Sequence, residues 1–239
     1  ILSSLVGSEM CIRDRFELIP ADILHVVFHH FPEIPQPLAT RGAMNVLMEI
    51  GSSNPASGIA DDSGETPLQT IMQETLATAF EDGLVIDATI AASEAQRNAL
   101  WDVRENAPES HKRSRGVARS DISLAQSSLA PFYEDMVAAV KAVDPTIRIC
   151  GYGHLGDGNL HFNLVADERS NSEFDSKKDQ LYELIYEHVA KYNGSISAEH
   201  GIGQTKRAQL AKVKAPEVLD VMRACLLYTS DAADDAGSG

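Results

Sequence analysis

The stretch GYGHLGDGNLHFN at residues 151–163 constrains the fold more than any other part of the sequence. Its central Asp157-Gly158 pair lies between two alternating runs, which is typical of a hairpin closed by a two-residue type I′ turn. In that register His154 lies directly opposite His161, with Cβ atoms about 5 Å apart. The hairpin therefore predicts two imidazoles that converge on one face of a two-stranded ribbon.

Two imidazoles at this separation can bind one divalent cation, and imidazole nitrogen suits zinc and its transition-metal neighbours. A third ligand is available in SAEHGIG at 197–203, where Glu199 precedes His200 at the start of a helix. Glu199 would complete a His, His, carboxylate set with open coordination positions, and His200 would remain free as a base. Gly201 and Gly203 would let the backbone approach a bound cofactor closely. A solvated histidine pair and a plain helix-entry turn are the simpler alternatives.

The two ends of the chain differ in character from the rest of the sequence. MCIRDR at 10–15 and CLLYTS at 225–230 resemble the two translations of a transposase mosaic-end adapter used in sequencing libraries. We therefore expect residues 1–15 and 225–239 to be adapter read-through, and residues 16–224 to be one domain cut from a longer gene. A signal peptide is the alternative for the first end, but ILSSLVG lacks a basic leader and a long apolar core.

The composition argues against several classes of partner. The chain has a formal net charge of −15 at pH 7, so it should not be drawn to nucleic acid or to anionic lipid. No apolar run approaches the length of a membrane span, and we expect no transmembrane segment. Outside the adapter-like ends Cys150 is the single cysteine, so no internal disulfide can form. These features predict a soluble globular domain.

Helices and strands are interleaved along the chain without an internal repeat. We expect strands at 43–51, 83–91 and 117–125, in addition to the hairpin. We expect helices at 67–82, 93–106, 129–143, 173–194 and 204–215, and loops at 30–42, at 52–66 and in the basic stretch 111–116. This order favours an α+β fold in which helices pack on a largely antiparallel sheet.

Four motifs together carry a resemblance to a known family. GYGHLGDGNLHFN followed by SAEHGIG, and preceded by LWDVREN and SDISL, resembles the C-terminal half of the FAD-linked 2-hydroxyacid dehydrogenases. That group contains D-lactate dehydrogenase, the glycolate oxidase flavin subunit and D-2-hydroxyglutarate dehydrogenase. The resemblance spans nearly all of residues 16–224. It implies a C-terminal substrate and metal domain, whereas FAD is held mainly by an N-terminal domain and by an Asn-Pro-Gly segment outside this chain.

The resemblance implies a role for each matching residue. The matched metal ligands, normally of zinc, are His154, His161 and Glu199. His200 matches the base that takes the hydroxyl proton, and Arg104 and Asn163 match substrate-binding residues. Arg119 stands where the D-2-hydroxyglutarate enzymes carry lysine, so the charge is kept but arginine offers a fork in place of a point charge. Pro108 stands where some members have a hydroxyl.

The implied activity is the oxidation of a D-2-hydroxy acid, of the D-2-hydroxyglutarate or D-lactate class, to the 2-oxo acid. Two cations, Arg104 and Arg119, favour a dicarboxylic substrate. The fragment alone should be inactive because the flavin that accepts the hydride is held elsewhere. A zinc hydrolase or a non-catalytic metal-binding domain is the alternative. The resemblance further implies a cytoplasmic enzyme, peripheral to the respiratory membrane when complete, and leaves open the electron acceptor and a homo-oligomeric state.

Overall fold

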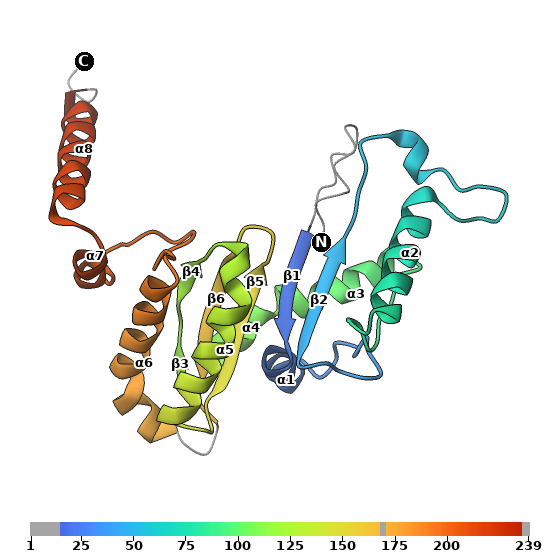
Figure 1. The fold of residues 1–239 in the computed structure, drawn as a ribbon, viewed down its shortest axis with the longest axis horizontal. Coiled ribbons are helices and arrows are strands. Elements are labelled where there is room, and N and C mark those ends of the chain that lie inside the picture. Colours follow the sequence, from blue (N-terminus) through green and yellow to red (C-terminus); the bar gives the residue numbers. More distant parts are fainter. Residues whose placement is uncertain (1–14, 168–170, 236–239) are drawn as a thin grey trace.

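The central element of the fold is an antiparallel sheet with helices on both faces (Figure 1). The computed structural model describes residues 15–167 and 171–235, of which 171–172 and 227–235 by backbone alone. The strands are β1 (Arg15–Pro20), β2 (Met44–Glu49), β3 (Val117–Ala118), β4 (Asp121–Ser123), β5 (Arg148–His154) and β6 (Asn159–Val165). Their spatial order is β2-β1-β5-β6-β3, β4 also pairs with β6, and each of these pairs is antiparallel. The expected α+β class with a largely antiparallel sheet is confirmed.

Helices connect the strands and cover the sheet. They are α1 (Ala21–His30), α2 (Pro67–Glu81), α3 (Glu94–Glu105), α4 (Ala107–Arg113), α5 (Gln126–Val143), α6 (Asn171–Lys191), α7 (Arg207–Val213) and α8 (Pro216–Asp235), with a 3-10 helix η1 at Pro55–Gly58. The five helices expected from the sequence are present, with ends shifted by a few residues. Among the described residues no helix is long and apolar enough to cross a membrane.

Two apolar cores lie on opposite faces of the sheet. On one face Phe162 and Leu164 pack with buried side chains of α5 and α6. On the other face Cys150 and Tyr152 pack with buried side chains of α1 and α4. Cross-strand partners share a face, so His161, which lies opposite Tyr152, projects from the α1/α4 face. The candidate metal ligands of the hairpin therefore stand on that face.

The register of the hairpin differs from the expected one. Tyr152, not His154, lies opposite His161, and Leu155–Gly158 form a four-residue turn. A type I′ turn requires positive φ at both central residues, but of the Asp-Gly pair only Gly158 has one, at +67°. The expected register was wrong by two residues. Because side chains alternate with a period of two, the slip leaves both histidines on the predicted face.

Two other expectations were also wrong. Residues 83–91 form no strand, and Leu84 and Ile86 are 78% and 65% exposed. β2 pairs only with β1 in the described sheet, so no partner strand orders this segment. The basic stretch 111–116 is not a solvated loop, because it begins in the last turn of α4 and His111 is buried.

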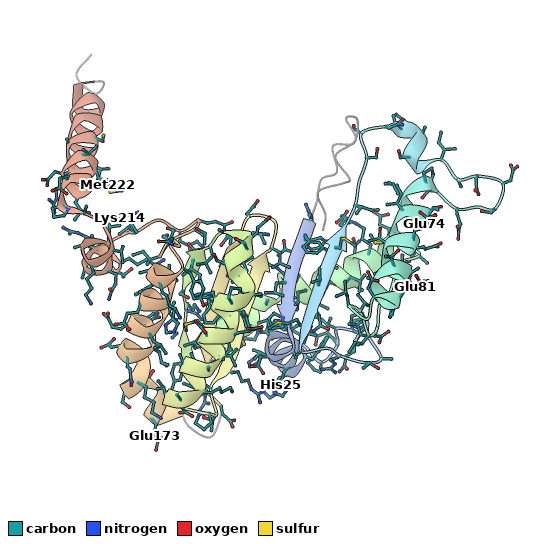
Figure 2. The ribbon with its side chains drawn as sticks, in the orientation of Figure 1. His25, Glu74, Glu81, Glu173, Lys214 and Met222 are labelled. Atoms are coloured by element: carbon teal, nitrogen blue, oxygen red, sulfur yellow. The ribbon has the colours of Figure 1, made fainter. Side chains whose placement is uncertain are left out.

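The two ends of the chain lie away from the sheet. α7 and α8 extend beyond α6 (Figure 1), and Figure 2 shows Lys214 and Met222 on this extension. On the other side of the molecule α2, which carries Glu74, has no buried residue. Of the first adapter-like segment, residues 1–15, all but Arg15 lie outside the described residues. Of the second, residues 225–235 form the C-terminal part of α8, and the remaining residues lie outside the described part of the chain.

Candidate metal and substrate site

Antiparallel pairing sets two carboxylate–imidazole pairs side by side on one face of the sheet. The register pairs Glu17 of β1 with His154 of β5, and Asp121 of β4 with His161 of β6. β1, β5, β6 and β4 are successive neighbours, and Tyr152 of β5 lies opposite His161. His154 stands two residues along β5 from the position opposite His161, so the two carboxylate–imidazole pairs lie in neighbouring rows on one face of the sheet.

Glu17 links His154 to Arg104. Its carboxylate is 3% exposed, hydrogen-bonds through Oε1 with Nδ1 of His154, and accepts through Oε2 from Nε of Arg104 at 2.7 Å. The Arg104 guanidinium also lies over the ring of Tyr152, 5.0 Å from its centroid. The contact with Glu17 leaves Nε2 of His154 for another partner, and Oε1 of Glu199 lies 3.8 Å from that nitrogen.

His161 lies between Asp121 and His200. Its Nδ1 is 4.0 Å from Oδ1 of Asp121, and its ring stacks on that of His200 with centroids 5.7 Å apart. Among the described residues, these three form the one group of potential metal ligands whose donor atoms all lie within 4.8 Å of one another. Burial and the charge of Arg104 lower the pKa of His161, so its ring is neutral near pH 7 and able to bind a metal.

Asp121 remains ionised in this surrounding although it is buried. Burial alone would raise its pKa, but the hydrogen bonds from the backbone of His200 and Glu199 and the charge of Lys206 outweigh burial and lower it. Its Oδ1 has no hydrogen-bond partner within the described part of the chain. A buried anionic oxygen of this kind favours a cation nearby.

The loop that carries Glu199 and His200 is open to solvent. Their side chains are 50% and 66% exposed. Gly201 and Gly203 have φ values of +70° and +51°, and a Cβ at either position would meet nothing within 4 Å. Open space therefore borders this loop, and the role of the two glycines toward a cofactor stays a prediction.

Asn163 lies on the same face as His161 and is held from two sides. Its Oδ1 accepts from the backbone N–H of Ser120 at 3.2 Å, and its Nδ2 donates to Nδ1 of His111 at 3.0 Å. Burial and the charge of Arg119 lower the pKa of His111 to about 4, so the ring is neutral at pH 7 with its proton on Nε2. Asn163 itself is buried, so its role toward a substrate stays a prediction.

Arg119 lies in the break between β3 and β4, where the sequence predicted one continuous strand. Its backbone N–H donates to Oη of Tyr182 at 3.1 Å, and its Nη2 donates to the carbonyl oxygen of His111 at 2.9 Å. In the described residues it forms no ion pair with Asp121 or Glu105. Its charge therefore remains without an acidic partner there.

A cavity of 370 Å³ opens beside His154 and Arg104. Glu17, Trp101 and Glu105 also line it. The volume suits a small ligand, and the wall carries both acids and the Arg104 guanidinium, which is paired with Glu17. The cavity therefore lies where a small molecule could reach the imidazole of His154 on β5.

The sequence analysis did not identify Glu17, Asp121 or His111 as parts of this site. Glu17 had a usable signal, because FELIP sets one acid among apolar residues, and a buried acid needs a charged or hydrogen-bonding partner. Asp121 and His111 had no local signal. Their roles depend on β6 and on the 195–203 loop, which are distant in sequence.

Comparisons with known proteins identify the family of this chain. Residues 59–225 match the family described as FAD linked oxidases, C-terminal domain. The D-2-hydroxyglutarate dehydrogenase of Stutzerimonas stutzeri is 32% identical over 193 residues, which cover 80% of this chain and 39% of that protein. The mitochondrial D-2-hydroxyglutarate dehydrogenase of Arabidopsis thaliana is 30% identical over 212 residues, 88% of this chain and 35% of that protein.

A third relative is named for a different activity. The D-2-hydroxyglutarate–pyruvate transhydrogenase of Saccharomyces cerevisiae is 30% identical over 206 residues, 83% of this chain and 39% of that protein. The chain thus spans between 35% and 39% of the length of these three relatives. What the complete proteins do therefore involves parts that this chain does not contain.

Proposed function

Because the chain belongs to the FAD-linked oxidases through their C-terminal domain, we propose that it is the substrate- and metal-binding part of a flavin-dependent dehydrogenase. The proposed reaction is the oxidation of a D-2-hydroxy acid to the 2-oxo acid. The observation that carries this proposal is the arrangement of two carboxylate–imidazole pairs on one face of the sheet, bordered by Arg104, Glu199 and His200. The pairs are Glu17 with His154 and Asp121 with His161. The names of the relatives support the substrate class.

The proposed metal ligands are His154, His161 and Glu199. Glu17 supports the first, because a carboxylate on Nδ1 of a histidine orients the ring and makes Nε2 a better donor. The buried, unpartnered Oδ1 of Asp121 adds negative charge beside the second. Imidazole and carboxylate donors together suit zinc or a similar divalent ion. When bound, such an ion supplies the positive charge that stabilises the developing alkoxide of the substrate.

His200 is the proposed base. Its ring stacks on His161, so it borders the space beside the proposed ligands. It would take the proton of the substrate hydroxyl as the hydride leaves C2. FAD, held mainly outside this chain, supplies the hydride acceptor. Gly201 and Gly203, with open space beside them, leave room for that cofactor next to the base.

We assign the binding of substrate carboxylates to Arg104, Arg119 and Asn163. Nε of Arg104 is occupied by Glu17, and its two terminal nitrogens remain able to bind a carboxylate as a fork. Arg119 supplies a second cation without an acidic partner among the described residues. Two cations favour a dicarboxylate such as D-2-hydroxyglutarate over D-lactate.

The test of this proposal replaces Arg119 in the complete flavin-containing protein. Arg119→Ala should raise KM for D-2-hydroxyglutarate on the order of tenfold or more, because a charge-assisted hydrogen bond contributes about 1.5–3 kcal/mol. KM for D-lactate should change little. Arg97→Ala, which removes an exposed arginine paired with Glu49, is the matched control and should change neither.

Three outcomes would count against the proposal. Equal losses on the two acids would show that Arg119 does not bind the distal carboxylate. A complete wild-type protein that oxidises neither acid would contradict the dehydrogenase and favour the zinc hydrolase. Dye reduction by the 239-residue chain alone would contradict the proposal that FAD is held mainly by another part of the complete protein.

A further inference from the structure

One carboxylate oxygen accepts several backbone hydrogen bonds from the loop that carries Glu199 and His200. Oδ2 of Asp121 accepts the N–H groups of Ala198, Glu199 and His200 at 3.1, 2.9 and 2.9 Å. Three successive N–H groups that point at one anionic oxygen fix the path of the whole turn. The acceptor comes from β4, a strand of the sheet that also carries the two histidines.

We propose that Asp121 is a positioning residue that fixes the loop against the sheet. It would hold Glu199 within reach of His154, at 3.8 Å, and the ring of His200 against that of His161. This inference rests on the proposed function for the roles of Glu199 and His200. The hydrogen bonds themselves do not depend on that function, so the two can fail separately.

Two further contacts fasten the loop to the same strand. Ser123 and Ser195 exchange backbone hydrogen bonds of 3.0 and 2.8 Å. Nζ of Lys206 donates to the carbonyl oxygens of Ile196 at 2.8 Å and of Asp121 at 3.4 Å. These contacts hold the two ends of the loop. Asp121 is the residue that holds the turn between them, where the proposed ligand and base lie.

Asp144 provides a matched control for a merely structural role. It is also a buried aspartate, and it accepts the backbone N–H of Thr146 at 2.9 Å and Nζ of Lys177 at 2.9 Å. It ends α5 just before β5, at the end of the hairpin opposite to His154. Its replacement should therefore weaken the fold without changing the distance between loop and sheet.

The direct test is amide hydrogen exchange in the full 239-residue chain. Asp121→Ala should speed exchange at 198–200 by at least about tenfold, because it removes the acceptor of three N–H groups, whereas the strands β5 and β6 keep their rates. Asp121→Asn retains one acceptor oxygen and should give a smaller increase, which keeps the test valid if the alanine variant does not fold. Asp144→Ala should leave 198–200 unchanged.

The second readout is the affinity for Co²⁺, followed by its visible absorption. Loss of an outer partner of this kind lowers metal affinity about 10- to 100-fold, so we expect that loss for Asp121→Ala and a smaller one for Asp121→Asn. Unchanged exchange at 198–200 in Asp121→Ala, or an equal loss of Co²⁺ affinity in Asp144→Ala, would overturn the inference. A wild-type chain that binds no Co²⁺ would instead contradict the proposed metal site, and the exchange rates would still decide the role of Asp121.

Discussion

The strand half and the loop half of the candidate site are built by different means. His154 and His161 stand on neighbouring strands, and each faces a buried carboxylate across the sheet. Glu199 and His200 stand on an exposed loop that hydrogen bonds hold to β4. The strand half depends on core packing and on a buried ion pair, and the loop half on a few polar contacts. Removing a packing or ion-pair contact should therefore cost more stability in the strand half than in the loop half.

The largest effect is expected from the core under the strand half. Phe162 is fully buried between the two site positions of β6 and packs edge-on against Phe132, with centroids 5.4 Å apart. Phe162→Ala should lower the free energy of unfolding by about 3–5 kcal/mol, measured by urea denaturation. Ile202→Ala, in the partly buried residue of the loop half, should cost roughly 1 kcal/mol. Similar losses for the two variants would break the comparison.

The next effect concerns the ion pair of the strand half. Glu17→Ala leaves the largely buried Arg104 without its counterion, which should lower the free energy of unfolding by about 3 kcal/mol. Glu49→Ala removes the partner of Arg97 in an ion pair that is more exposed than the pair of Glu17 with Arg104. It should cost about 1 kcal/mol or less. Thermal and urea unfolding of the two variants measure the difference. If Glu17→Ala and Glu49→Ala lost the same free energy of unfolding, the Glu17 carboxylate would not stabilise the strand half.

A smaller effect is the pH dependence that His111 contributes. Its pKa of about 4 lies below the usual histidine value of 6.5, so between these two values the unfolded chain binds a proton that the folded chain does not. The free energy of unfolding should therefore fall as pH drops from 6.5 toward 4, by up to about 3 kcal/mol in total. Urea denaturation at several pH values measures this slope.

The matched variants for this slope are His111→Gln and His188→Gln. The first removes the buried titrating ring, so the fall in stability below pH 6.5 should be clearly reduced. The second replaces a half-buried histidine of α6 and should leave the slope in place. An unchanged slope in His111→Gln would show that another group carries the acid sensitivity.

Local patterns predicted much of the fold. The long helix α6 follows from the helical spacing of Leu181, Ile185 and Val189, which the structure buries. The two strands of the hairpin follow from alternation. The register does not, because it depends on contacts remote in sequence, such as the bond from the Leu155 N–H to the carbonyl oxygen of Phe16 at 2.9 Å. Local turn preference gave way to this pairing with β1.

The candidate site was predictable to a different degree in its two halves. Motifs named the imidazoles, the loop acid and the arginines, and these assignments stay predictions. The buried partners Glu17 and Asp121 could not be derived from spacing, because each reaches its histidine through strand pairing over more than 30 residues of chain. The partner of such a residue lies on another strand, so the spacing of residues in its own segment does not reveal it.

Two sets of residues could hold the metal: the proposed ligands, and the cluster of Asp121, His161 and His200. Zn²⁺ titration calorimetry of the chain and two variants distinguishes them. We predict one ion per chain, a loss of more than about 100-fold in affinity for His154→Ala, and a change of less than about threefold for His200→Ala, because a ligand should matter more than its neighbour. The opposite order, with His200→Ala losing the ion and His154→Ala keeping it, would place the metal among Asp121, His161 and His200 and contradict the proposed site.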